Sequence, residues 1–303
     1  MGIFSKNVNC RKGYKKFKDR CIKKNTPAQP GAMCLLDGKT FCSGDKSMKP
    51  MIARAGGKTQ LVPTIMKKAP VHDVYVEPFV GGGAMFLRKP KAKKNVINDK
   101  DSDVITVYKS FQNGSGFSKC DLTPSKKRFD KIKAKTNKSA CDVAYLNKLS
   151  FGSSMKSFAL GKFMGKNPTG TYKKRFPVGR NDIGIKYQKA HGEDYKEKMK
   201  NTVVTSQGFE KVMKKYDSKK TLHYLDPPYV GTEKIYKEND AVSPEKVCDL
   251  AKKMKGKVII SYNDHPAVRK ACKGMKISKV NTRYSFSGAS NNKGAKEVLI
   301  TNY

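Results

Sequence analysis

The sequence predicts an α/β fold in which helices cover both faces of a mostly parallel β-sheet. Two observations lead to this prediction. Short apolar segments alternate with segments of helical periodicity on both sides of a long polar stretch, and this alternation is typical of parallel strands joined by helical crossovers. Moreover, glycines or a carboxylate follow three of the apolar segments, at the strand ends where such sheets bind their ligands.

Residues 1–50 are expected to form an appendage to this fold. They contain basic runs, scattered cysteines and a short segment with Pro and Gly, but no sustained apolar periodicity. Such a segment is either disordered or a small hairpin pinned by its cysteines.

Residues 51–111 contain the first part of the expected catalytic domain. The pattern predicts a helix at 61–66, a strand at 74–76, a helix at 84–87, a strand at 96–99 and a helix at 104–111. The first of these strands runs into the turn Gly81-Gly82-Gly83, and the second ends in Asp99.

Residues 112–195 differ in kind, because they are rich in Lys, Ser, Gly, Asn and Phe and have few apolar runs. We expect a separate insertion that is irregular and partly helical. The alternation resumes in residues 196–303, the second part of the catalytic domain. The expected elements are strands at 203–204, 222–225 and 258–260, helices at 209–216, 244–254 and 265–273, and a final hairpin of 277–284 with 297–303.

The charge of the chain indicates nucleic acid as a partner. The 303 residues include 64 Lys and Arg against 25 Asp and Glu, which gives a formal net charge of +39. Basic surfaces bind nucleic acids through phosphate contacts and counterion release; a solvated surface is the alternative explanation. Most of the basic residues are Lys, which suits contact with the nucleic-acid backbone better than bidentate reading of a base.

The segment Asp226-Pro227-Pro228-Tyr229 directly follows an apolar strand and carries the strongest functional signal. Two prolines remove two N–H donors and stiffen the chain, which leaves carbonyl groups free to point into a site. A carboxylate and a carbonyl can together accept both hydrogens of one exocyclic amino group. The nitrogen lone pair is then directed at an electrophile, while Tyr229 offers a flat ring on which a base can stack.

The turn Gly81-Gly82-Gly83 and Asp99 predict a cofactor site. Glycines allow the backbone to approach a ligand closely, and a carboxylate at the next strand end can accept the hydroxyl groups of a ribose. Each signal has a structural alternative, which is a tight connection for the turn and an N-cap of the following helix for Asp99.

Several motifs occur in a fixed order along the chain. They are Gly56-Gly57-Lys58, Tyr75-Val76-Glu77-Pro78-Phe79 with its glycines, Asn98-Asp99, Asn167-Pro168 with Gly170 and Tyr172, Asp226-Pro227-Pro228-Tyr229, Ser261-Tyr262-Asn263-Asp264, and Glu297-Val298-Leu299-Ile300-Thr301-Asn302. With these motifs, residues 54–303 resemble the Dam-type DNA adenine N6-methyltransferases. The resemblance implies the Rossmann-like mixed sheet of S-adenosylmethionine-dependent methyltransferases, with an inserted target-recognition domain. It also implies direct methyl transfer from S-adenosylmethionine to adenine N6 of a base flipped out of double-stranded DNA.

The resemblance assigns roles to the matching positions. The catalytic residues are Asp226, Pro227, Pro228 and Tyr229. The residues expected to bind the cofactor are Gly57, Lys58, Glu77, Phe79, Gly81, Gly82, Gly83, Asp99 and Asp226. Contacts with DNA are expected from the insertion, at Lys156, Asn167, Tyr172, Lys173, Lys174 and Arg175.

The insertion departs from the family pattern at one position. Family members that read GATC have an Arg where this chain has Lys156, and Lys cannot make the bidentate contact with guanine. The recognised DNA sequence therefore stays open. Two other functions remain alternatives: a catalytically weak DNA-binding or packaging protein on the same fold, and a methyltransferase for cytosine N4 or RNA. A cognate restriction endonuclease is a further partner that the resemblance raises.

The chain has eight cysteines but no Cys-x-x-Cys pair, and its four histidines lack ligand spacing, so we expect no metal. Four cysteines outside the appendage are expected to be buried free thiols, namely Cys120, Cys141, Cys248 and Cys272. Free thiols favour a reducing intracellular compartment, which is the cytoplasm, or a viral factory or virion if the basic appendage is of the kind found in large DNA viruses. Neither a membrane-spanning segment nor a signal peptide is expected.

Overall fold

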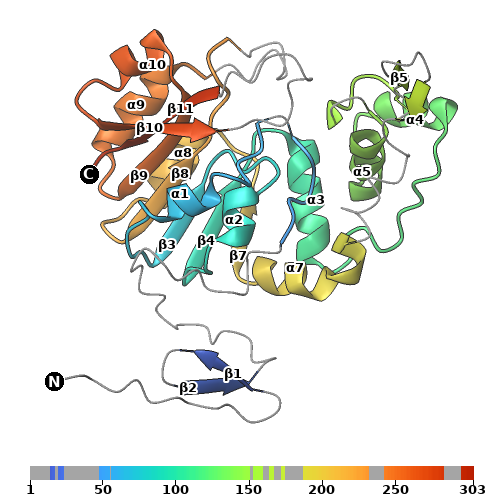
Figure 1. Cartoon of the computed structure of the whole chain (residues 1–303), viewed down its shortest axis with the longest axis horizontal. Coiled ribbons are helices and arrows are strands. Elements are labelled where there is room, and N and C mark those ends of the chain that lie inside the picture. The colour runs from blue at the N-terminus through green and yellow to red at the C-terminus, as the bar shows by residue number, and fades with distance from the viewer. Residues whose placement is uncertain are drawn as a thin grey trace. The chain divides into compact units, whose positions relative to one another are not determined.

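The computed structural model describes residues 14–17, 20–23, 48–54, 56–150, 153–159, 164–166, 172–174, 187–231, 242–282 and 295–303. The chain divides into two compact units, Met1–Ser47 and Met48–Tyr303. In the first unit, β1 (Tyr14–Phe17) and β2 (Arg20–Lys23) pair in antiparallel fashion (Figure 1). This pair is a hairpin, one of the two forms expected for residues 1–50, and the pairing of its cysteines lies outside the described residues.

The second unit is built on a seven-stranded sheet with the order β10-β11-β9-β8-β3-β4-β7 (Figure 1). Its strands are β3 (Val74–Glu77), β4 (Lys94–Asn98), β7 (Thr202–Thr205), β8 (Thr221–Leu225), β9 (Lys257–Asn263), β10 (Lys276–Thr282) and β11 (Ala295–Thr301). The strands from β9 to β7 are parallel, whereas β11 and β10 are antiparallel to their neighbours. The predicted mixed α/β sheet, with its closing hairpin, is confirmed.

Burial on both faces explains the apolar runs from which the central strands were predicted. All five residues of β8 are buried, as are Tyr75, Val76 and Glu77 of β3. Strands covered on both sides are expected to be continuously apolar rather than alternating.

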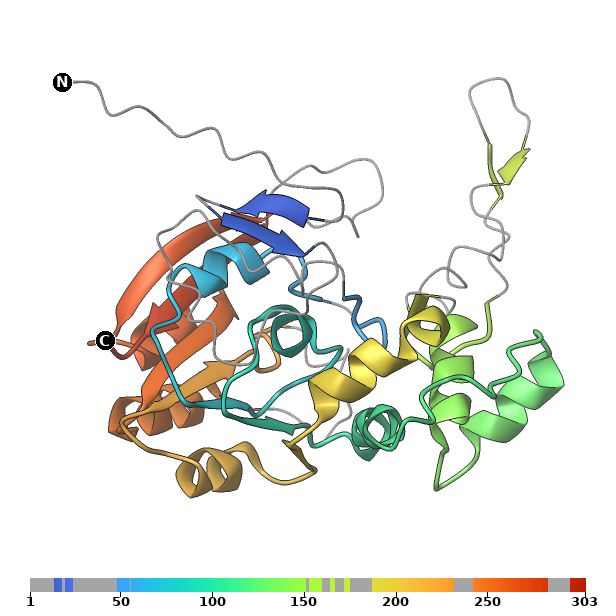
Figure 2. The ribbon, with the colours of Figure 1, turned by 90° about the horizontal axis from the view of Figure 1, so that it is seen from below.

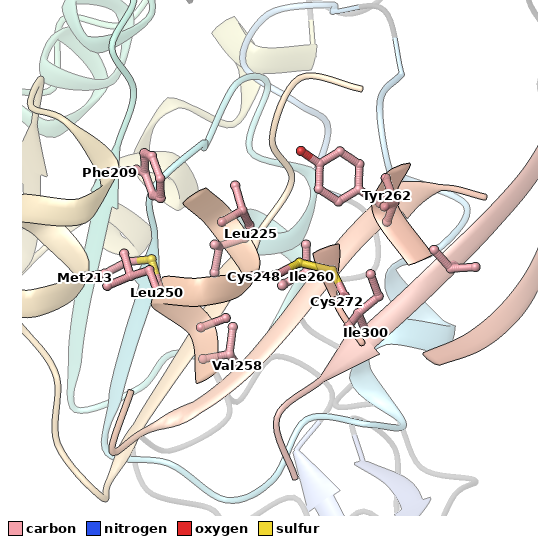
Figure 3. Packing of buried hydrophobic residues seen from close by; sticks show 14 residues of the cluster. Phe209, Met213, Leu225, Cys248, Leu250, Val258, Ile260, Tyr262, Cys272 and Ile300 are labelled. Atoms are coloured by element: carbon pink, nitrogen blue, oxygen red, sulfur yellow. A yellow bond between two sulfur atoms is a disulfide. The ribbon is translucent and has the colours of Figure 1, made fainter. Parts of the chain in front are cut away.

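Three helices cover one face of the sheet, namely α8 (Phe209–Lys215), α9 (Pro244–Lys253) and α10 (Pro266–Ala271). Their apolar side chains meet Leu225, Ile260 and Ile300 of the sheet in one buried cluster (Figure 3). The opposite face is covered by α1 (Val62–Met66) and α2 (Ala84–Arg88) (Figure 2).

The insertion has a small core of its own. Buried side chains of α4 (Lys126–Lys133) and α5 (Ala140–Lys148) form a cluster, which consists of Phe129, Ile132, Tyr145, Leu146 and Leu149. A short antiparallel pair, β5 (Met164–Lys166) with β6 (Tyr172–Lys174), follows in the chain.

Two helices connect the insertion with the sheet. They are α3 (Ser102–Gln112) and α7 (Gly192–Met199), which pack against each other, while α3 also packs against α5 and β7. Phe111 of α3 contacts Phe117 and Tyr195, with ring centroids 4.9 and 5.0 Å apart. The expected end of the insertion at residue 195 lies within α7. This domain boundary stays a prediction.

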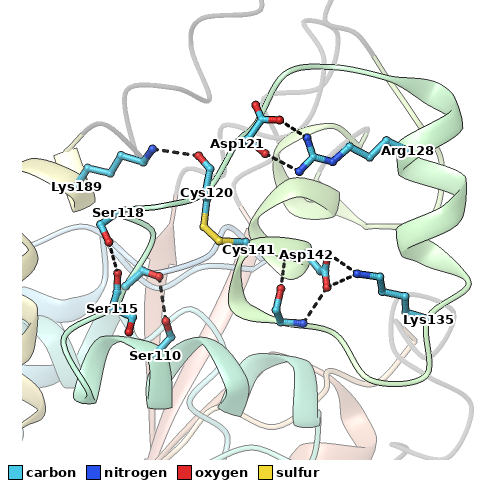
Figure 4. Close-up of a disulfide and its surroundings, with 12 residues drawn as sticks. Ser110, Ser115, Ser118, Cys120, Asp121, Arg128, Lys135, Cys141, Asp142 and Lys189 are labelled. Atoms are coloured by element: carbon cyan, nitrogen blue, oxygen red, sulfur yellow. Dashed lines mark hydrogen bonds and ion pairs between the residues drawn. A yellow bond between two sulfur atoms is a disulfide. The ribbon is translucent and has the colours of Figure 1, made fainter.

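The expectation of four free thiols is wrong. Cys120 is joined to Cys141 (Figure 4), and Cys248 to Cys272 (Figure 3). The first disulfide links the segment after α3 to α5, and the second links α9 to the residue that caps the C-terminus of α10. Partners 21 and 24 residues apart meet because these elements pack together, which no local pattern reveals. The expectation of a reducing compartment rested on free thiols and loses that support.

Among the described residues, no helix is long and apolar enough to cross a membrane.

Candidate active site

Three adjacent strands, β8, β3 and β4, bring the predicted motifs together. Because these strands are parallel, Asp226, the glycine turn and Asp99 all follow carboxyl ends at the same edge of the sheet. They line one cleft of about 1120 Å³. The predicted residues along this cleft are Gly57, Lys58, Glu77, Phe79, Gly81, Gly82, Gly83, Asp99, Lys156, Asp226 and Pro228.

The turn after β3 requires glycine at two positions. Gly83 has a φ of +76°, which L-residues with a side chain rarely adopt, and a Cβ atom there would lie 2.2 Å from the Tyr108 hydroxyl oxygen. A Cβ atom on Gly82 would lie 2.7 Å from the carbonyl oxygen of Ile52. The turn is therefore packed against the segment before the first motif, and its open side faces the cleft.

Asp99 is attached to this turn rather than to the following helix. Its Oδ2 accepts a hydrogen bond from the Gly81 N–H at 2.9 Å, and its Oδ1 accepts one from the Asp101 N–H at 3.0 Å. The N-cap of α3 is Asp101, whose side chain accepts from the Asp103 N–H. The capping alternative for Asp99 is thus wrong. Burial raises the pKa of Asp99, while Arg54 and the two N–H donors act in the opposite direction.

One wall of the cleft contains residues 50, 52–54 and 56–58. Two amide side chains that sequence reasoning missed hold the first part of this wall in place. Asn147 of α5 accepts from the Ala53 N–H at 3.1 Å and donates to the Ala53 carbonyl at 2.8 Å. Gln188 donates to the carbonyl groups of Pro50 and Met51 at 2.6 and 2.9 Å. These residues lie 94 to 138 positions away in sequence, so no spacing rule could have found them.

Lys58 is the cation that lies beside the Asp226–Tyr229 segment. Its side chain is only 5% exposed, and its Nζ lies 3.0 Å from Asp226 Oδ1 and 3.7 Å from Glu297 Oε1. It also donates to the Gly56 carbonyl at 2.7 Å and lies 4.6 Å from the centre of the Tyr229 ring. Burial raises the pKa of Asp226, and Lys58 opposes this effect.

Tyr229 is fixed beside Lys58. Its hydroxyl donates to Glu297 Oε1 at 2.8 Å, and its ring lies 5.8 Å from that of Tyr262 in β9. Asn263 donates to the Val230 carbonyl at 3.0 Å and so holds the end of the loop. Tyr229 and Pro227 are not among the residues that line the cleft.

Glu77 is buried at the end of β3. It accepts a hydrogen bond from the Tyr75 hydroxyl at 2.6 Å. Burial raises the pKa of Glu77 to about 8, although the Tyr75 bond acts in the opposite direction. Burial therefore favours the protonated form of Glu77 more than that of an ordinary surface carboxyl.

The insertion contributes a loop with unusual backbone geometry to the same cleft. Ser153 and Met155 have φ values of 58° and 59°, which are strained for residues with side chains. Asn147 donates to the Ser153 carbonyl at 3.1 Å, and Ser150 Oγ accepts from the Met155 N–H at 2.8 Å. These bonds hold the loop so that Lys156 lines the cleft.

The structure places only part of the predicted DNA-contacting set. Tyr172, Lys173 and Lys174 lie in β6, without a description of their side chains, and Asn167 and Arg175 lie outside the described residues. Lys133 and Lys138 were not predicted, but they line the cleft near Lys156, and Lys133 Nζ donates to the Lys156 carbonyl at 2.7 Å. In the part of the chain described, no group of three or more His, Cys, Asp or Glu could hold a metal ion.

A mixed seven-stranded sheet with a cleft at the carboxyl ends of its central strands is the fold of the S-adenosylmethionine-dependent methyltransferases. Within that class, residues 55–286 match the family model of the D12 class N6 adenine-specific DNA methyltransferases, so the chain belongs to this family.

Curated relatives agree with this assignment. The Type II methyltransferase M.CviBI of Paramecium bursaria Chlorella virus NC1A is 24% identical over 272 residues, which cover 84% of this chain and 100% of the relative. M.MjaIII of Methanocaldococcus jannaschii is 25% identical over 300 residues, covering 84% and 99%. M1.LlaDCHI of Lactococcus lactis subsp. cremoris is 25% identical over 291 residues, covering 85% and 96%. The predicted activity, site-specific adenine methylation of DNA, is confirmed at the level of the family.

Proposed function

We propose that the cleft transfers a methyl group from S-adenosylmethionine to N6 of an adenine flipped out of double-stranded DNA, with Asp226 and the Pro227 carbonyl holding the amino group. The observation that carries this proposal is that Asp226 shares one cleft with the glycine turn and Asp99. A methyl donor and a target amino group bound in this cleft would meet at the end of β8.

The residues of the cleft fit the cofactor. The glycine turn presents backbone without side chains, where a nucleoside or an amino-acid group can approach closely. Asp99 is half-buried and uses one lone pair of each oxygen for the two N–H donors, so it can still accept the hydroxyl groups of a ribose. The proposed cofactor set is completed by Gly57, Lys58, Glu77, Phe79 and Asp226, which also line the cleft. The cofactor would supply an electrophilic methyl group.

The target amino group requires two acceptors. The Asp226 carboxylate supplies one, and the carbonyl of Pro227 supplies the other, since the two prolines have no N–H groups that would pair locally. When both amino hydrogens are held, the nitrogen lone pair leaves conjugation with the ring and becomes nucleophilic. Asp226 can afterwards take up the proton that the methylated nitrogen must lose, and the burial that raises its pKa favours this transfer.

Tyr229 would stack on the flipped base. Its hydroxyl is anchored by Glu297 at 2.8 Å, so the plane of the ring is set before the base arrives. Stacking on an aromatic side chain offsets part of the cost of leaving the duplex.

Lys133, Lys138 and Lys156 line the cleft on the side of the insertion, and we propose that they contact DNA phosphates. Because the net charge is +39, DNA affinity should fall steeply between low and physiological salt. Lys156→Ala should reduce the slope of log affinity against log salt by about one phosphate contact, or roughly 0.9. The same affinity at both salt concentrations would refute this assignment.

The test of the reaction is transfer of a labelled methyl group from S-adenosylmethionine to duplex DNA. Asp226→Ala should abolish transfer, whereas Asp249→Ala, on the exposed surface of α9, is the matched control and should not change it. An Asp226→Ala protein as active as the wild type would refute the proposed mechanism. Salt-sensitive DNA binding without any transfer would instead support a DNA-binding or packaging protein.

The names of the relatives raise a cognate restriction endonuclease as a partner, since they are Type II methyltransferases. If such a partner exists, DNA that this enzyme has methylated should resist its cleavage. Expression in a methylation-free host, followed by sequencing that detects methylated bases, would identify the DNA recognition sequence that both proteins share.

A further inference from the structure

Glu297 is a buried carboxylate that the motif roles above do not assign. It lies in β11, which is separated from β8 by β9, and it is 1% exposed. Its Oε1 accepts from the Tyr229 hydroxyl at 2.8 Å and lies 3.7 Å from Lys58 Nζ. Its Oε2 has no hydrogen-bond partner among the described residues. A carboxylate buried with so little compensation is costly to the fold, so its position calls for a functional explanation.

Lys58 lies between two carboxylates. Its Nζ is 3.0 Å from Asp226 Oδ1 and 3.7 Å from Glu297 Oε1, and all three side chains are mostly buried. The Gly56 carbonyl, at 2.7 Å, fixes the ammonium group between them. One cation therefore neutralises two acids, one of which is the proposed acceptor of the adenine amino group.

Because Lys58 is shared between Asp226 and Glu297, it competes less with the target amino group for the Asp226 carboxylate. Asp226 must accept a hydrogen from the target amino group, but the ammonium group of Lys58 is a stronger donor to the same carboxylate. A Lys58 that belonged to Asp226 alone would compete with the substrate and would make the carboxylate a weaker base.

We propose that Glu297 is a positioning residue that draws Lys58 partly away from Asp226, and thereby leaves the Asp226 carboxylate available to the adenine amino group while it anchors Tyr229. This inference rests on the proposed function of Asp226. Glu297 acts through Lys58 and Tyr229 and does not touch the substrate.

Glu297→Gln separates the charge from the hydrogen bond, because the amide oxygen can still accept from the Tyr229 hydroxyl. We expect kcat for methyl transfer to fall about tenfold or more with KM for DNA changed less than about twofold, the pattern of an interaction that matters only in the transition state. In a plot of kcat against pH, the acid limb is the rise in kcat as the catalytic carboxylate ionises. This limb should move to lower pH, since Lys58 then pairs with Asp226 alone and stabilises its ionised form. Burial also raises the pKa of Glu297, whereas Lys58 and the Tyr229 hydroxyl act in the opposite direction. Asp226 further interacts with Glu77, Tyr224 and Tyr229. Glu297 helps to raise the pKa of both tyrosines, but they stay neutral on the acid side of the profile with or without it.

Three further variants make the test decisive. Glu245→Gln, on the exposed side of α9, is the matched control and should keep the kinetics of the wild type. Tyr229→Phe removes the hydroxyl but keeps the ring, so it should not move the acid limb. Glu297→Asp retains the charge but withdraws it from Lys58, and it should shift the limb in the same direction; it replaces Glu297→Gln if that variant does not fold.

The inference is overturned if folded Glu297→Gln keeps the kcat and the acid limb of the wild type, or if Tyr229→Phe reproduces its kinetics in full. A merely structural Glu297 would lower the free energy of unfolding without moving the acid limb, which also overturns the inference. None of these outcomes depends on whether Asp226→Ala is inactive, so failure of this inference can be distinguished from failure of the proposed function.

Discussion

Gly83→Ala tests how tightly the cofactor turn is built. At a φ of +76°, any side chain costs about 1–2 kcal/mol of backbone strain. The added Cβ atom would also lie 2.2 Å from the hydroxyl oxygen of Tyr108, a fully buried side chain whose hydroxyl donates to the Gly81 carbonyl at 3.1 Å. Relief of this overlap requires movement in the core, which costs about 1–3 kcal/mol. The free energy of unfolding should therefore fall by roughly 2–5 kcal/mol in total.

Urea denaturation measures this loss, and calorimetry with S-adenosylmethionine should show weaker binding. Gly274→Ala is the matched control, since Gly274 has a φ of +89° but no atom within 4 Å of the added Cβ position; it should show the strain alone. Adding Tyr108→Phe to Gly83→Ala should recover part of the loss, because the next atom of the ring is 3.2 Å away. A Gly83→Ala protein as stable as the wild type would refute the reasoning.

Three further predictions concern groups around the cleft. Asn147→Ala leaves the Ala53 N–H and carbonyl without their partner, so it should cost about 1–3 kcal/mol of stability and weaken cofactor binding; unchanged unfolding and calorimetry would contradict this. The Cys248–Cys272 disulfide closes a loop of 24 residues, so Cys248→Ala should cost about 3 kcal/mol in urea denaturation under non-reducing conditions; no difference from the wild type would mean that the bond is absent in solution. Because burial raises the pKa of Glu77 from 4.5 to about 8, this group stabilises the fold below its unfolded pKa, and the contribution is lost as the pH rises through about 8. Urea denaturation should show that the free energy of unfolding falls less between about pH 6 and about pH 9 for Glu77→Gln than for the wild type. An equal fall in both proteins would contradict the raised pKa of Glu77.

The elements could be predicted from the sequence because their residues carry local signals. The expected strand at 258–260 lies within β9 (Lys257–Asn263), and the expected helix at 104–111 lies within α3 (Ser102–Gln112). Apolar periodicity marks the middle of an element well, whereas its ends depend on caps such as Asp101.

The order of the strands and the shared contacts could not be predicted in the same way. The adjacency of β8, β3 and β4 is set by packing of the whole sheet, and a single sequence does not display it. Asn147 and Glu297 have no local signal for their roles, because their partners lie 94 and 68 residues away. The two disulfides could not be predicted for the same reason, since their cysteines lie 21 and 24 residues apart.

The structure of the insertion is the part of the molecule that the sequence predicts least well. Lys156 was predicted to contact DNA, which stays a prediction; that it lines the cleft depends on a strained loop held by bonds from Asn147 and Ser150. The DNA contacts proposed for this region would therefore depend on tertiary contacts as much as on residue type.

Mass spectrometry of nucleosides from duplex DNA treated with the enzyme and S-adenosylmethionine tests the central claim most directly. The account predicts N6-methyladenine with the wild type and no methylated base with Asp226→Ala. N4-methylcytosine in place of N6-methyladenine, or equal N6-methyladenine from both proteins, would contradict it.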